Sequence, residues 1–142
     1  MLSSRRGFLS SSLAAGAASA VLAAPAVHAQ EKNKKYRTAI VGTGWWGMNI
    51  LGEAVASDQC EVVAMCDVDE SQLKGAVEKL SGKTSDQPKR YADFRDMLDK
   101  EKPEICIVAT PDHWHPLITN AAVKAGANVY VFCKSRDRHR RS

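Results

Sequence analysis

Short apolar runs alternate along the chain with stretches whose apolar residues are spaced as in a helix. Four of the runs are enriched in β-branched residues and have the length of strands; they cover residues 36–41, 60–66, 105–109 and 128–132. The run at 105–109 is apolar at nearly every position, which is the pattern of a strand buried on both faces. Each run is therefore expected to form a strand.

The stretches between these runs predict helices. Residues 71–80 show this best, because their apolar side chains fall on one face of a helix. Further helices are expected at 46–56, 94–102 and 116–125. Residues 81–88 are polar and are expected to form a loop. Strands separated by helices favour a parallel sheet with right-handed crossovers, which is an α/β fold.

A glycine-rich turn joins the first predicted strand to the first helix. Residues 42–47 read GTGWWG, and Asp67 lies twenty residues after the last glycine, at the end of the second strand. Gly42 allows a tight turn, Gly44 lets the backbone approach a pyrophosphate, and Gly47 lets helix and strand pack closely. The helix N-terminus attracts the anion. This placement is the dinucleotide-binding fingerprint, and it predicts a Rossmann-type doubly wound sheet. The alternative is a glycine-rich turn without a ligand.

The acidic residue of this fingerprint also predicts which dinucleotide binds. Asp67 can accept hydrogen bonds from both ribose hydroxyls, and its charge would repel a 2′-phosphate. Asp69 and Glu70 add negative charge, and no arginine is nearby in the sequence. We therefore expect NAD rather than NADP as the cofactor.

Residues 1–29 have the features of a targeting segment. Arg5 and Arg6 precede residues 7–27, which carry no charge, and the segment closes on small residues. This pattern predicts a signal peptide of the twin-arginine type and hence a periplasmic or otherwise exported protein. An uncleaved membrane anchor is the alternative, since the length would just span a bilayer. Weak hydropathy and Pro25 favour the signal peptide over a stable anchor.

Charge is divided unevenly along the rest of the chain. Residues 30–133, the expected nucleotide-binding domain, hold thirteen Lys or Arg against fifteen Asp or Glu. The tail at 134–142 holds five basic residues against one acidic residue. The basic character of the whole chain therefore comes from its two ends, and nucleic acid is not an expected partner of the domain. A basic arm for nucleic acid or anionic lipid is the alternative function of the tail.

The four cysteines are expected to be free core thiols. Cys60 and Cys66 stand at the two ends of one predicted strand, about 20 Å apart, which is too far for a disulfide. Cys106 and Cys133 lie in other apolar runs. Such thiols usually behave as small buried hydrophobic groups. No cysteine or histidine spacing in the sequence predicts a metal site.

A second group of chemically active residues follows the run at 105–109. Residues 110–115 read TPDHWH. Ligands of open α/β sheets bind beyond the carboxyl ends of the strands, so this loop is expected to share an edge with the glycine turn. Asp112 is expected to cap the next helix and Trp114 to pack. His113 and His115 are two residues apart, which is a poor spacing for shared metal ligation.

The order and spacing of four motifs resemble one known family. The motifs are GTGWWG at 42–47, CDVD at 66–69, YADF at 91–94 and ATPDHWH at 109–115. Together they resemble the N-terminal domain of the glucose–fructose oxidoreductase, inositol dehydrogenase and MocA (Gfo/Idh/MocA) family over about residues 36–131. The resemblance implies NAD(P)-dependent oxidation or reduction of a sugar, cyclitol or polyol carbon, which a second domain holds in the full-length protein.

The resemblance also implies roles for single residues. It assigns the pyrophosphate turn to Gly42, Thr43, Gly44, Trp45, Trp46 and Gly47. It assigns the adenosine ribose to Asp67, and the nicotinamide side to Thr110, Pro111 and His115. Family members continue from the last strand into Glu-Lys-Pro, whose lysine sits at the reaction centre.

The chain departs from the family after that last strand. Glu and Pro of the family motif are missing, and Lys134 stands near the lysine position but one residue late. The basic tail at 134–142 has the composition of sequence translated out of frame after about Val131. We therefore expect a truncated, catalytically incomplete oxidoreductase. The alternative is a free-standing dinucleotide-binding or interaction module that works with a partner chain. The substrate, the reaction direction and the oligomeric state do not follow from the sequence.

Overall fold

The fold is described from a computed structural model, which covers residues 34–132. The chain divides into two units, Met1–Gln30 and Glu31–Ser142. The predicted signal peptide, the basic tail, Cys133 and Lys134 lie outside the described residues.

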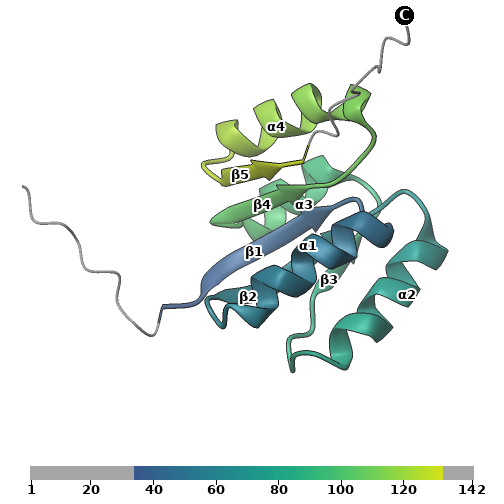
Figure 1. The fold of residues 1–142 in the computed structure, drawn as a ribbon. Coiled ribbons are helices and arrows are strands. Elements are labelled where there is room, and N and C mark those ends of the chain that lie inside the picture. The colour runs from purple at the N-terminus through teal and green to yellow at the C-terminus, as the bar shows by residue number, and fades with distance from the viewer. Residues whose placement is uncertain (1–33, 133–142) are drawn as a thin grey trace, which may run out of the picture. The chain divides into compact units, whose positions relative to one another are not determined.

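Five strands form one parallel sheet in the order β3-β2-β1-β4-β5 (Figure 1). They are β1 (Tyr36–Val41), β2 (Cys60–Cys66), β3 (Lys89–Tyr91), β4 (Ile105–Val108) and β5 (Asn128–Val131). The four strands expected from the apolar runs are confirmed, as is the parallel α/β sheet. The order reverses beside β1, between β2 on one side and β4 on the other, which is where ligands of such sheets bind.

Four helices and one short turn connect the strands. They are α1 (Trp45–Ala56), α2 (Glu70–Ser81), α3 (Phe94–Glu101), the 3₁₀ turn η1 (Asp112–Trp114) and α4 (His115–Lys124). The four predicted helices are confirmed, with ends that differ by one residue at most positions. Helices α1 and α2 cover one face of the sheet, and α3 and α4 cover the other (Figure 1).

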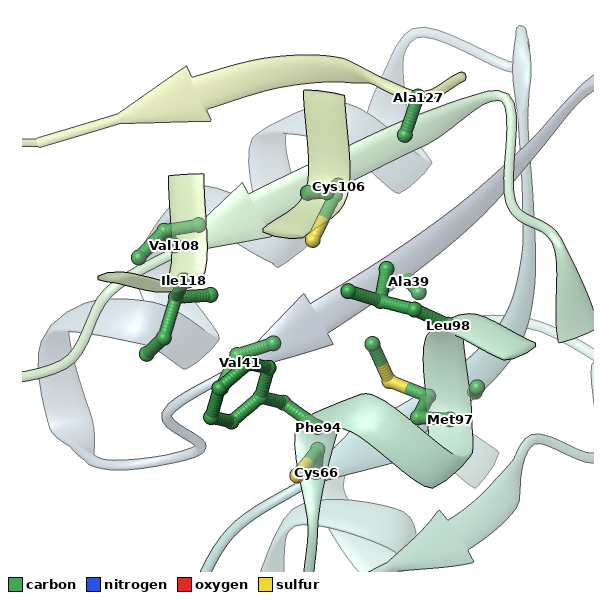
Figure 2. Close-up of a cluster of buried hydrophobic side chains, with 12 residues drawn as sticks. Ala39, Val41, Cys66, Phe94, Met97, Leu98, Cys106, Val108, Ile118 and Ala127 are labelled. Atoms are coloured by element: carbon green, nitrogen blue, oxygen red, sulfur yellow. The ribbon is translucent and has the colours of Figure 1, made fainter. Parts of the chain in front are cut away.

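The core consists of two apolar layers, one on each side of the sheet. On the α3 and α4 side, Phe94 and Ile118 point toward Val41 and Val108 of the central strands (Figure 2). On the other side, Ile40 packs with side chains of α1 and α2. Neighbouring residues of β1 thus enter opposite layers, which explains why the central strands are apolar throughout.

The strand β3 was not predicted from the sequence. It has three residues, two of them charged and exposed, so it shows neither an apolar run nor an alternation. It pairs with the last three residues of β2, Ala64 to Cys66. The pairing places residue 92 and those that follow it beside the end of β2.

The ends of the helices differ in how they are capped. Asp69 caps α2, and Asp93 caps α3 by accepting a hydrogen bond from the backbone N–H of Arg95. The expectation that Asp112 caps α4 is wrong. The chain enters α4 through η1, so Trp114 occupies the N-cap position and makes no side-chain capping bond.

Three cysteines lie within the described residues, and all three are free and buried: Cys60, Cys66 and Cys106. Burial raises the pKa of Cys106 to about 12. Burial also raises the pKa of Cys66 to about 12, with a contribution from the nearby carboxylates Asp67 and Asp93. The prediction of free core thiols is confirmed for these three cysteines, and a raised pKa disfavours the reactive thiolate form.

A buried carboxylate ties α3 to two strands. The side chain of Glu101 is 7% exposed and forms ion pairs with Lys89 of β3 (3.0 Å) and Arg37 of β1 (3.7 Å). The Tyr91 hydroxyl donates to the same carboxylate. This hydrogen bond, together with Lys89 and Arg37, holds the pKa of Glu101 below its usual value against the effect of burial.

Glu101→Gln is expected to lower the free energy of unfolding by about 1–3 kcal/mol at neutral pH, because charge-assisted hydrogen bonds are lost. A carboxylate with a lowered pKa contributes stability above its ordinary pKa of 4.5, and this contribution disappears as the pH falls through the lowered value. The difference between the two proteins should therefore shrink as the pH falls below the ordinary pKa of 4.5. Urea unfolding at neutral pH and at a pH below 4.5 measures the difference in the free energy of unfolding. Glu61→Gln, at an exposed glutamate, is the control. A difference that stays constant with pH would contradict the ion-pair role.

Candidate functional site

Two cavities lie at the carboxyl ends of the strands. The tryptophan cavity has a volume of about 540 Å³, and Trp45, Trp46 and Phe132 form one of its walls. The aspartate cavity has a volume of about 420 Å³ and is lined by Asp67 and by the start of α3. The two cavities share the wall residues Gly44, Ala109, Thr110 and Pro111. The glycine turn and the loop after β4 therefore meet at one edge of the sheet, as predicted.

The three glycines of the turn differ in what surrounds them. Gly42 has a φ of +94°, and a Cβ there would lie 2.7 Å from the carbonyl carbon and oxygen of Ala109. A Cβ on Gly47 would lie 2.1 Å from the carbonyl oxygen of Gly42. A Cβ on Gly44 would meet nothing within 4 Å. Gly42 and Gly47 are therefore needed for backbone packing, whereas Gly44 leaves open space toward both cavities.

The N-terminus of α1 opens at this turn. Gly44 is the N-cap and offers no side-chain hydrogen bond, and the first turn of α1 contains no acidic residue. The backbone N–H of Met48 donates to the carbonyl of Gly44 at 3.0 Å. The N–H groups before it face the turn at the positive end of the helix dipole. A pyrophosphate would fit this arrangement of free N–H groups and open space.

Asp67 is joined to the glycine turn by its side chain. One carboxylate oxygen accepts hydrogen bonds from the backbone N–H (2.7 Å) and the hydroxyl (3.0 Å) of Thr43. The other accepts from the backbone N–H of Asp69 at 3.1 Å. Thr43 is buried and does not line either cavity. Thr43 thus holds the Asp67 side chain in position by two hydrogen bonds, and Asp67 lines the aspartate cavity.

The loop after β4 contains an unpartnered buried hydroxyl. Thr110 Oγ1 is buried and has no hydrogen-bond partner, and Thr110 lines both cavities. Pro111 lies beside it in both walls. A buried hydroxyl without a partner costs free energy unless a ligand or water satisfies it, so this atom favours a ligand site.

His115 lies behind this loop. It is 4% exposed, and its Nε2 lies 2.7 Å from the carbonyl oxygen of Thr110. It is not among the residues that line either cavity. The resemblance placed His115 on the nicotinamide side. In the structure His115 does not reach the cavities itself, and its contact with the Thr110 carbonyl would help to position the loop that does.

Sequence reasoning missed two parts of the site. Phe132 packs against Trp46, with ring centroids 4.8 Å apart, and completes the aromatic wall of the tryptophan cavity. Arg95, at the start of α3, lines the aspartate cavity together with Asp67. The second miss follows from the missed strand, because β3 brings this segment beside β2. The YADF motif at 91–94 was the one sequence feature that pointed to this segment, and it did not indicate where the segment lies relative to Asp67.

Within residues 34–132, no group of three or more His, Cys, Asp and Glu side chains could hold a metal ion. None of the helices in the described part of the chain is long and apolar enough to cross a membrane. Lys134, the proposed counterpart of the family's lysine, lies outside the described residues.

Residues 36–133 match the family described as "Oxidoreductase family, NAD-binding Rossmann fold" (GFO_IDH_MocA). A curated relative, the glycosyl hydrolase family 109 protein of Stenotrophomonas maltophilia, is 36% identical over 131 residues, which is 88% of this chain and 28% of that protein. The chain thus spans less than a third of the length of this relative.

Two solved structures have the same fold and are more than a quarter identical in sequence to this chain. The WlbA dehydrogenase of Bordetella pertussis, in complex with NADH and UDP-GlcNAcA, is 28% identical with a TM-score of 0.59, over 69% of this chain and 29% of that one. The myo-inositol 2-dehydrogenase of Lactobacillus plantarum is 29% identical with a TM-score of 0.59, over 69% and 28%. With the family match over most of its length, this chain belongs to the Gfo/Idh/MocA oxidoreductases and carries their NAD-binding Rossmann domain.

Proposed function

We propose that this chain is the cofactor-binding part of an exported enzyme that transfers hydride to or from a sugar or polyol carbon. The observation that carries the proposal is Gly44, whose missing side chain leaves space at the helix N-terminus between the two cavities. The twin-arginine pattern of residues 1–29 supports export of the folded domain. The dehydrogenase neighbours support the substrate class.

The chain's own residues would divide the work of holding NAD, which supplies the hydride acceptor. Within the turn at 42–47, the backbone N–H groups of Gly42 and Thr43 are already bonded, so the N–H groups that follow them would bind the pyrophosphate. Asp67 would accept hydrogen bonds from the ribose hydroxyls. Thr110 and Pro111 would border the nicotinamide, with the Thr110 hydroxyl available to it. A substrate domain would hold the reacting carbon, and Lys134 stands near the position of the reacting lysine that the family resemblance implies.

The first test is the choice between NAD and NADP. Calorimetric titration of the 142-residue chain should show tighter binding of NAD, because Asp67 would repel a 2′-phosphate. Asp67→Asn should weaken NAD binding roughly tenfold and narrow the gap between the cofactors, since it removes the charge and keeps an acceptor for Thr43. Exposed Asp99→Asn, which removes the same charge away from both cavities, is the control. Tighter binding of NADP by the unchanged protein would refute the assignment of Asp67.

A second candidate reaction is hydrolysis of a glycosidic bond. The observation in its favour is the name of the Stenotrophomonas relative, a glycosyl hydrolase, and NAD-dependent glycoside hydrolases are known. Net NADH formation separates the two reactions. Oxidation of a sugar or polyol converts NAD to NADH, whereas hydrolysis of a glycosidic bond involves no net oxidation and leaves the amount of NADH unchanged. A panel of free sugars and cyclitols, and one of aryl glycosides, would be tested with NAD. Binding of NAD without turnover in either panel is expected both of a catalytically incomplete oxidoreductase and of the free-standing module, so the panels decide only between the two reactions.

A further inference from the structure

We propose that Arg95 is a second determinant of cofactor choice, and that Asp93 competes with the 2′-phosphate of NADP for its guanidinium group. The inference rests on the proposed function, because it takes the adenosine ribose to lie in the aspartate cavity beside Asp67. It changes the picture given by the sequence, in which no arginine was near this carboxylate.

The pairing of β2 with β3 brings the two segments together. Cys66 is in register with Tyr91, and the backbone N–H of Asp67 donates to the Tyr91 carbonyl at 3.1 Å. The residues that follow each strand therefore leave the sheet side by side. Asp67 and Arg95 both line the aspartate cavity, which has a volume of about 420 Å³. Arg95 thus shares the wall of the cavity in which the ribose end of a dinucleotide would lie.

The guanidinium of Arg95 is occupied within its own turn. Its Nη1 lies 3.3 Å from Asp93 Oδ2, and the group lies 4.9 Å from the centre of the Phe94 ring. The other carboxylate oxygen of Asp93 accepts the backbone N–H of Arg95 at 2.8 Å. The side chain of Arg95 is 63% exposed, and that of Asp93 is 49% exposed. An ion pair this exposed is worth about 0–1 kcal/mol, so a competing anion can displace it.

The charges of the cavity explain why NADP is disfavoured beyond the effect of Asp67. Its charged wall residues are Asp67, Asp93 and Arg95, so two carboxylates face one cation. Guanidinium groups bind phosphates in a bidentate manner and with geometric specificity. Arg95 therefore has the chemistry to hold a 2′-phosphate, but Asp93 competes for it and Asp67 repels the ligand. Loss of both carboxylate charges would leave the arginine free for the phosphate.

The test uses five proteins based on the full 142-residue chain. They are the unchanged chain, Asp67→Asn, Asp67→Asn with Asp93→Ser, this double variant with Arg95→Gln, and the double variant with Lys100→Gln. Serine at position 93 removes the charge and still serves as an N-cap for α3. Calorimetry with NADP and NAD gives the ratio of the two affinities, and far-UV circular dichroism verifies the helix content.

Adding Asp93→Ser to Asp67→Asn should raise the ratio of NADP to NAD affinity by roughly five- to tenfold, and adding Arg95→Gln should reverse the gain. Lys100→Gln is the matched control, because it removes a positive charge from the same helix outside both cavities. A ratio that Asp93→Ser leaves unchanged, or that Lys100→Gln lowers as much as Arg95→Gln, would overturn the inference. Failure of the unchanged chain to bind NAD would instead overturn the proposed function.

Discussion

Gly44→Val abolishes dinucleotide binding and leaves the far-UV circular dichroism nearly unchanged; this is the expected result with the largest effect on function. Gly44 has a φ of −64°, which a valine adopts readily. A Cβ at this position meets no protein atom within 4 Å, so the fold does not oppose the side chain. The valine would instead occupy the space that both cavities share and where a pyrophosphate would lie.

Calorimetric titration with NAD measures the effect, and we expect affinity to fall at least about a hundredfold, or about 2.7 kcal/mol. Gly75→Val is the matched control. Gly75 lies in α2, a Cβ there also meets nothing within 4 Å, and it lines neither cavity. NAD binding by Gly44→Val that equals binding by Gly75→Val would mean that the glycine turn serves another purpose.

Gly47→Ala is expected to destabilise the fold severely, although it adds only one methyl group. The new Cβ would lie 2.1 Å from the carbonyl oxygen of Gly42 and 3.2 Å from the Cβ of Ala109. The backbone at Gly42 cannot easily shift, because its N–H donates to the Cys66 carbonyl at 2.9 Å and holds β1 against β2. Overpacking against fixed backbone costs about 3 kcal/mol or more, a large part of the stability of a small domain.

Urea unfolding followed by circular dichroism measures this loss, with Gly44→Ala as the control for a methyl group in the same turn. The control is expected to remain within about 1 kcal/mol of the unchanged protein, because no neighbouring atom opposes its Cβ. Equal unfolding midpoints for Gly47→Ala and Gly44→Ala would show that the contact between α1 and β1 is less tight than the structure indicates.

The central strands and the four helices could be predicted from the sequence because burial makes their patterns regular. Both faces of β1 and β4 pack against helices, so these strands appear as continuous apolar runs. The edge strand β3 has no such pattern. Its three residues are too few to show an alternation of apolar and polar positions, and two of them are exposed. Because β3 was not predicted, the sequence also did not indicate that Arg95 lies in the wall of the aspartate cavity.

The roles of single site residues were harder to predict than the elements that hold them. The glycine spacing alone indicated different tasks for Gly42, Gly44 and Gly47, and the space around each glycine agrees with those tasks. The spacing of His115 from Thr110 could not show that its ring contacts the back of the loop. That contact depends on η1, which turns the chain before α4 begins. No pattern in the sequence predicted η1.

The wall shared by the two cavities bears on how a long ligand would be distinguished from a short one. A ligand that fills both cavities must cross the glycine turn between them, so its two halves are tethered at that point. Once one half is seated, the other is held at a high effective concentration beside its own cavity. Two separate mononucleotides have no such tether. The protein can therefore prefer a whole dinucleotide over its fragments without any contact that the fragments lack.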